Sequence, residues 1–70
     1  MSLIGRISVY FDAKGYGFIR PTDGSKDQFF HISEFPAAEM AIVGALVEFD
    51  VTERDGRTRA TNILVIESGE

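Results

Sequence analysis

Short runs of alternating apolar and polar residues recur along this chain, and turn-forming residues separate them. The pattern is clearest in residues 45–52, where Val47, Phe49 and Val51 alternate with polar side chains. Alternation with a period of two is typical of a strand with one buried face, so these three residues are predicted to point inward. Similar runs occupy residues 3–11, 16–20, 28–31 and 59–67. The chain is therefore predicted to form five short β-strands.

Residues 33–41 are the one segment whose composition favours helix, and Pro36 limits it to a turn or two. A chain of 70 residues has room for a single hydrophobic core. Five short strands must close on themselves to bury their apolar faces and to limit exposed edges. The sequence thus predicts an all-β fold, a five-stranded antiparallel barrel, in one domain spanning residues 1–70 with its core at about 3–67.

Composition excludes several classes of function. The chain contains no cysteine, so it has neither a disulfide framework nor a thiolate metal site, and a reducing cytoplasm is the expected location. The longest apolar run, residues 63–66, is far shorter than the roughly 20 residues of a membrane helix. His31 has no clustered second ligand, and Ser33 is expected to make a local backbone hydrogen bond. We therefore expect no membrane partner, no metal, no cofactor and no enzymatic activity.

The formal net charge of −4 argues, taken alone, against binding of nucleic acid, which normally requires a basic surface. The distribution of charge weakens this objection. Residues 1–31 carry four basic and three acidic side chains, whereas residues 32–70 carry three basic and eight acidic ones. An anion-binding surface is therefore predicted mainly in the first half, with help from Arg54, Arg57 and Arg59 around the expected hairpin turn.

Glycine and aromatic residues alternate in residues 14–19, which read Lys-Gly-Tyr-Gly-Phe-Ile. Glycine adds no packing to a strand and costs backbone entropy, so its presence needs a reason. Alternation puts Tyr16 and Phe18 on one face of the strand, while Gly17 leaves room for the core on the opposite face. Two adjacent flat rings are thus predicted on the outer face.

Phe29 and His31 have the same alternating spacing on the next predicted strand. Together with Tyr16 and Phe18 they can form one platform of four π-surfaces. Exposed rings beside a few cations are typical of proteins that bind single-stranded nucleic acid, where each stacked base contributes about 1–3 kcal/mol. The alternative is that these aromatic residues simply fill the core.

The two aromatic segments resemble the two ribonucleoprotein-type motifs of the cold-shock domain family, whose members form a five-stranded OB-type barrel. Residues 14–19 match the family pattern K-G-[FY]-G-F-I, and residues 27–33 resemble D-[VI]-F-V-H-[FIL]-S. Residues 44–49 and 59–63 are similar to G-x-x-V-x-F and x-A-x-N-V. The resemblance implies binding of single-stranded RNA or DNA, with roles such as RNA chaperone or transcription regulator.

The resemblance also implies roles for individual residues: Lys14 contacts phosphate, Asp27 accepts from a base edge, and the rings stack on bases. Val9 stands where the family usually has Trp. Strand parity puts Tyr10 on the polar face, so Tyr10 is expected to replace that ring. The complete expected site consists of Tyr10, Lys14, Tyr16, Phe18, Asp27, Phe29, His31, Arg6, Arg20 and Arg57.

Two further departures from the family pattern affect the expected stability and affinity. Gln28 takes an inward position that is normally apolar, where an unpaired amide costs stability. The connection over residues 35–43 is short, which predicts a smaller footprint on the nucleic acid. We expect a monomer, with a strand-swapped dimer as the alternative. A second hypothesis, from another class, is a protein-interaction module, or a domain of a longer polypeptide, that docks a partner chain on the same rings.

Overall fold

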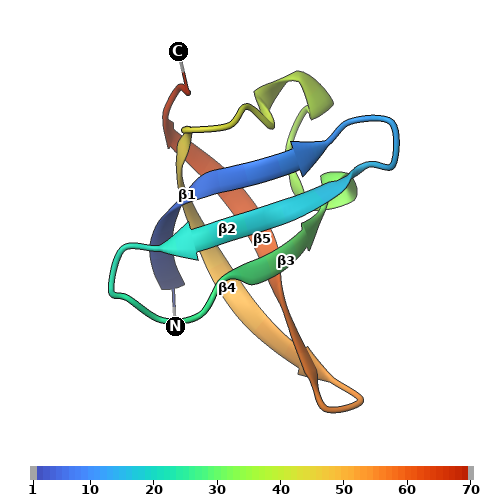
Figure 1. Ribbon diagram of the computed structural model, residues 1–70, viewed down its shortest axis with the longest axis vertical. Coiled ribbons are helices and arrows are strands. Elements are labelled where there is room, and N and C mark those ends of the chain that lie inside the picture. Colours follow the sequence, from blue (N-terminus) through green and yellow to red (C-terminus); the bar gives the residue numbers. More distant parts are fainter. Residues whose placement is uncertain (1, 70) are drawn as a thin grey trace.

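Five strands close into a barrel in the computed structural model, which describes residues 2–69 (Figure 1). The strands are β1 (Ser2–Phe11), β2 (Tyr16–Pro21), β3 (Gln28–His31), β4 (Leu46–Arg54) and β5 (Arg57–Glu67). Their order around the barrel is β1-β2-β3-β5-β4, and β4 pairs with β1 to complete the ring. The predicted all-β, five-stranded barrel is confirmed.

Four of the five seams of the barrel are antiparallel, as expected, and the seam between β3 and β5 is parallel. The exception follows from the closure itself, because a ring with an odd number of strands cannot alternate direction at every seam. The parallel seam is short and pairs Phe29 with Arg59. It therefore brings an arginine of β5 next to an aromatic residue of β3.

The core collects inward side chains from all five strands. Its largest fully buried members are Phe30, Phe49, Ile7, Ile19, Ile63 and Val47. The prediction that Val51 points inward is wrong, because this side chain is 36% exposed. Strand β4 pairs with β1 only as far as Asp50, and from there it pairs with β5 alone. The end of β4 and the start of β5, residues 53–58, form a two-stranded ribbon that projects from the barrel in Figure 1 and is called the β4–β5 arm below.

Two short 3₁₀ turns, η1 (Ile32–Glu34) and η2 (Ala38–Met40), lie in the connection between β3 and β4. This agrees with the expected loop containing a little helix. Phe35 and Ala41 anchor the connection in the core. Within residues 2–69, the structure contains no helix with the length and apolar character needed to cross a membrane.

Candidate nucleic-acid interface

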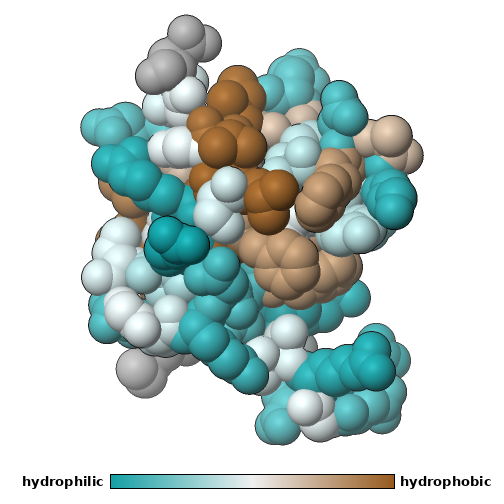
Figure 2. Space-filling model, in the orientation of Figure 1, coloured by the Kyte–Doolittle hydropathy of each residue, from teal (hydrophilic) through white to brown (hydrophobic). Residues whose placement is uncertain are grey.

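Cross-strand pairing arranges the outward side chains of β1, β2 and β3 in two rows. The rows are Phe11–Tyr16–His31 and Val9–Phe18–Phe29. Five of these six side chains are aromatic or imidazole rings, and we call Phe11, Tyr16, Phe18, Phe29 and His31 the ring platform. Figure 2 shows the apolar side chains gathered over β1 and β2 on this side of the molecule. The structure thus brings together the four rings that the sequence analysis placed on one face.

Neighbouring rings of the platform are in contact. The ring centroids are 5.3 Å apart for Phe11 and Tyr16, 5.6 Å for Tyr16 and Phe29, and 6.0 Å for Phe18 and Phe29. Phe11 is 44% exposed and the other four rings are partly exposed. The four aromatic rings therefore form a continuous surface that solvent can reach, and His31 pairs with Tyr16 across the strands beside it.

Beneath the platform a third row faces the core, and it consists of Tyr10, Gly17 and Phe30. A Cβ at Gly17 would lie 2.8 Å from Cε2 of Phe30 and would also collide with the carbonyl oxygen of Val9. The rings of Tyr10 and Phe30 stack across this position, with centroids 5.9 Å apart and planes 19° apart. Gly17 is thus required by the interior, as the sequence analysis anticipated.

The placement of Tyr10 on the outer polar face is wrong, and its ring packs against the core instead. The cause is an irregularity in β1, where the pairing with β2 shifts register between Ile7 and Val9. A register shift of this kind reverses the face to which the following side chains point. Phe11, which the sequence analysis did not include, consequently occupies the position on the platform that was assigned to Tyr10. Strict alternation in residues 3–11 gave no signal of this irregularity.

A groove of about 740 Å³ separates the ring platform from the β4–β5 arm. Phe18 and Phe29 line it on one side, and residues of the β4–β5 hairpin line it on the other, namely Arg54, Asp55, Arg57, Thr58 and Arg59. Figure 2 shows the corresponding notch between the apolar surface and the hydrophilic arm at the lower right. Arg57 therefore lies beside the platform, as expected for a phosphate contact. Arg54 and Arg59, which the sequence analysis named as auxiliary cations but did not include in the expected site, lie there as well.

The remaining expected cations differ in how freely they can reach an anion. The guanidinium of Arg6 donates to the carbonyl oxygen of Gly44 at 2.9 Å and lies 3.5 Å from the carboxylate of Glu67. Arg20 pairs with Asp27 at 3.6 Å, so these two expected site residues are each other's partners. Lys14 is exposed in the turn between β1 and β2, next to the platform. Exposed ion pairs are weak, and a phosphate can compete with them.

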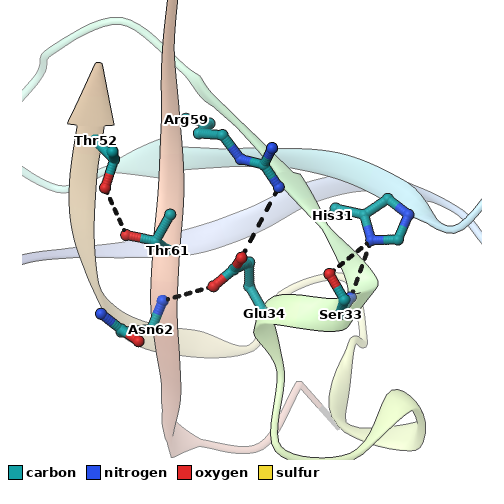
Figure 3. Close-up of polar contacts among 7 residues, drawn as sticks. All are labelled: His31, Ser33, Glu34, Thr52, Arg59, Thr61 and Asn62. Atoms are coloured by element: carbon teal, nitrogen blue, oxygen red, sulfur yellow. Dashed lines mark hydrogen bonds and ion pairs between the residues drawn. The ribbon is translucent and has the colours of Figure 1, made fainter. Parts of the chain in front are cut away.

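His31 closes one end of the platform and also caps η1 (Figure 3). Its Nδ1 accepts a hydrogen bond from the backbone N–H of Ser33 at 3.1 Å and lies 2.9 Å from the Ser33 hydroxyl. Because Nδ1 acts as an acceptor, the neutral ring carries its proton on Nε2. The backbone N–H of Ser33 thus makes a local hydrogen bond, but its hydroxyl contacts the imidazole of His31 and not the backbone as expected, and the two contacts together fix the orientation of the imidazole.

A second polar cluster joins η1 to β5 (Figure 3). Oε1 of Glu34 accepts a hydrogen bond from the backbone N–H of Asn62 at 3.0 Å, and Oε2 lies 3.9 Å from Nη2 of Arg59. Asn62 adopts a left-handed conformation, with φ at 51°, at an irregularity in the β4–β5 pairing. Asparagine tolerates this conformation better than most residues. The cluster positions Arg59 above the ring of Phe29, with its guanidinium carbon 5.8 Å from the ring centroid.

Residues 3–66 match the model of the 'cold-shock' DNA-binding domain family. This chain belongs to the cold-shock domain family. Among curated proteins, it is similar to the cold shock-like protein CspE of Escherichia coli K12, with 34% identity over 64 residues that cover 89% of this chain and 93% of CspE. It is also similar to cold shock protein 1 of Arabidopsis thaliana, with 40% identity over 62 residues that cover 84% of this chain and 21% of the plant protein.

The cold-shock fold is also found in a solved structure described as drosophila Unr CSD456. It superimposes with a TM-score of 0.76 at 26% sequence identity and covers 90% of this cold-shock domain and 26% of the other chain. The domain therefore spans nearly the whole of the bacterial relative, but only about a fifth of the plant protein and a quarter of the drosophila chain.

Proposed function

We propose that this cold-shock domain binds single-stranded RNA or DNA on the ring platform, as a monomer in the cytoplasm and without catalysis. The observation that carries the proposal is the surface of four contacting aromatic rings and the neighbouring His31, all at least partly exposed, beside a groove whose lining includes three arginines. Rings stack on bases of any sequence, and cations follow the phosphate backbone. Each half of the site thus supplies one of the two interactions that a single strand needs.

The spacing of the rings favours a single strand over a duplex. Successive nucleotides along a strand of B-DNA are about 3.4 Å apart. Ring centroids on the platform are 5.3–6.0 Å apart. Bases that occupy neighbouring rings must therefore separate from one another, which a duplex does not allow. A strand held in this way would be unable to pair, and this is the physical basis of RNA-chaperone activity.

Fluorescence anisotropy of a labelled heptathymidine strand tests the proposal directly. Phe18→Ala removes one stacking ring and is expected to weaken binding by about 5- to 150-fold, which corresponds to about 1–3 kcal/mol. Leu64→Ala is the matched control, because Leu64 is 56% exposed on β5 and is no part of the platform or groove. Its affinity is expected to equal that of the wild type. Binding should also fall with salt, with a logarithmic slope of about −0.7 for each phosphate contact.

Absence of binding by the folded wild type, at low salt and high micromolar protein, would refute the proposed function. Equal losses in Phe18→Ala and Leu64→Ala would also refute it, because the platform would then have no special part in binding. In either case the protein-interaction hypothesis would take its place, with the same rings as the docking surface.

A further inference from the structure

Arg59 is held in an unusual position between an aromatic ring and a carboxylate. Its guanidinium lies over Phe29, and Nη2 lies 3.9 Å from Oε2 of Glu34. Its Nε is buried and has no hydrogen-bond acceptor among the described residues. A guanidinium presents five donors. Most of the hydrogen-bond donors of Arg59 therefore have no acceptor among the described residues, although Arg59 lies on the wall of the groove beside the platform.

Glu34 is fixed independently of Arg59. Its Oε1 accepts from the backbone N–H of Asn62 at 3.0 Å, and its side chain is only 26% exposed. The long and partly exposed contact with Arg59 is a weak ion pair. The carboxylate is thus held next to Arg59, whose guanidinium lies over a platform ring, and it offsets the positive charge there. A phosphate that approaches Arg59 is repelled by the same carboxylate.

We propose that Glu34 competes with the nucleic-acid phosphate for Arg59 and thereby limits the affinity of the platform. In the free protein, Glu34 holds the guanidinium over Phe29. In the complex, a phosphate takes the place of Glu34 as the partner of Arg59, and the guanidinium remains over the ring. This inference rests on the proposed function, since it concerns the same surface.

Glu34→Gln tests the competition, because an amide oxygen can still accept from the N–H of Asn62 while the negative charge is removed. The variant is expected to bind heptathymidine about two- to fivefold more tightly than the wild type, the range expected for an exposed ion pair. The salt dependence should steepen by up to about 0.7 in logarithmic slope, the contribution of one phosphate contact. Arg59→Gln alone should weaken binding by a similar factor.

Two controls separate competition at Arg59 from a general effect of charge. Glu39→Gln makes the same change in net charge on η2, where Glu39 is exposed and has no ion pair within residues 2–69, and it should change affinity much less than Glu34→Gln. The double variant Glu34→Gln/Arg59→Gln should bind like Arg59→Gln alone, because the competition needs both partners. Thermal unfolding monitored by circular dichroism confirms that each variant is folded.

Several results would overturn the inference while leaving the proposed function intact. They are an unchanged or weaker affinity in Glu34→Gln, an equal gain in Glu39→Gln, and a gain that persists in the double variant. An unchanged affinity in Arg59→Gln would overturn it as well, because Arg59 would then make no phosphate contact. The proposed function is judged separately, by the loss of binding in Phe18→Ala.

Discussion

Replacing Gln28 by leucine is expected to stabilise the barrel. Gln28 is only 6% exposed, and it faces the core next to Ile19, its partner in the pairing of β2 with β3. Its Nε2 donates to the carbonyl oxygen of Lys26 at 3.5 Å, which is a poor hydrogen bond, and its Oε1 is buried without a partner. Only one of the two polar atoms of the amide therefore has a hydrogen-bond partner, and that bond is weak.

The size of the effect follows from these contacts. A buried polar atom without a partner costs about 1–3 kcal/mol, and a weak hydrogen bond contributes at most about 0.5 kcal/mol. Leucine has a similar volume and removes both the unpaired oxygen and the weak hydrogen bond. The free energy of unfolding should therefore rise by about 1–2 kcal/mol. For a domain of this size, that corresponds to a rise in Tm of roughly 5–15 °C.

Differential scanning calorimetry of the wild type, Gln28→Leu and Gln28→Glu measures this effect. Gln28→Glu keeps the shape but places an unpaired carboxylate in the core, so it should lower the Tm near pH 7. The affinity for heptathymidine should not change in Gln28→Leu, because residue 28 points away from the platform. A Tm of Gln28→Leu at or below that of the wild type would refute the reasoning, since Oε1 would then have a favourable partner such as an internal water.

Two further predictions concern the platform and the loop after β2. Phe11→Ala should weaken binding of the single strand by about 5- to 150-fold with little change in Tm, whereas Tyr10→Ala should lower the unfolding free energy by about 2–4 kcal/mol, because its ring packs on Phe30. Anisotropy measures the affinity of both variants and calorimetry measures their stability. A loss of stability in Phe11→Ala together with a loss of binding alone in Tyr10→Ala would contradict the structure. The hydroxyl and the backbone N–H of Ser25 both donate to Asp23 and hold the pKa of this carboxyl below its usual 3.8. The stability from these bonds should therefore be complete above pH 3.8 and lost as the pH falls through the lowered pKa, and NMR titration should show a higher Asp23 pKa in Ser25→Ala.

The sequence predicted those parts of the fold that depend on local pattern. Alternation located the five strands, and the spacing of Tyr16, Phe18 and Phe29 placed their rings on one face. The same rule failed at Tyr10 and at Val51 for two different reasons. At Tyr10 the register of β1 shifts, and at Val51 the strand has already passed the edge of its partner β1. Neither event changes the local composition, so only the pairing reveals them.

The sequence analysis named Arg54, Arg57 and Arg59 as auxiliary cations, but the position of Arg59 over a platform ring could not be predicted, for a related reason. Arg59 occupies a position that the family pattern leaves variable. The turn before it has the composition of an ordinary charged hairpin turn, which gives no indication of a binding role. Its importance comes from the parallel seam, which pairs it with Phe29, thirty positions earlier in the chain. Glu34 reaches the same point from η1. Contacts between such distant segments depend on the closure of the barrel, which residue spacing does not encode.

The glycine between the two rings of β2 serves the interior and the surface together. On the inner face, the space left by Gly17 lets Tyr10 and Phe30 stack across the sheet. On the outer face, Tyr16 and Phe18 flank this position and belong to the two rows of the platform. The stacked inner pair therefore lies directly beneath the sheet that carries the exposed rings. A side chain at residue 17 would displace either Phe30 or β1, and both of these support the platform from below. The loss of one outer ring, in contrast, leaves the inner layer intact. The mixture of glycine and aromatic residues in this strand is thus a joint requirement of the core and of the binding surface.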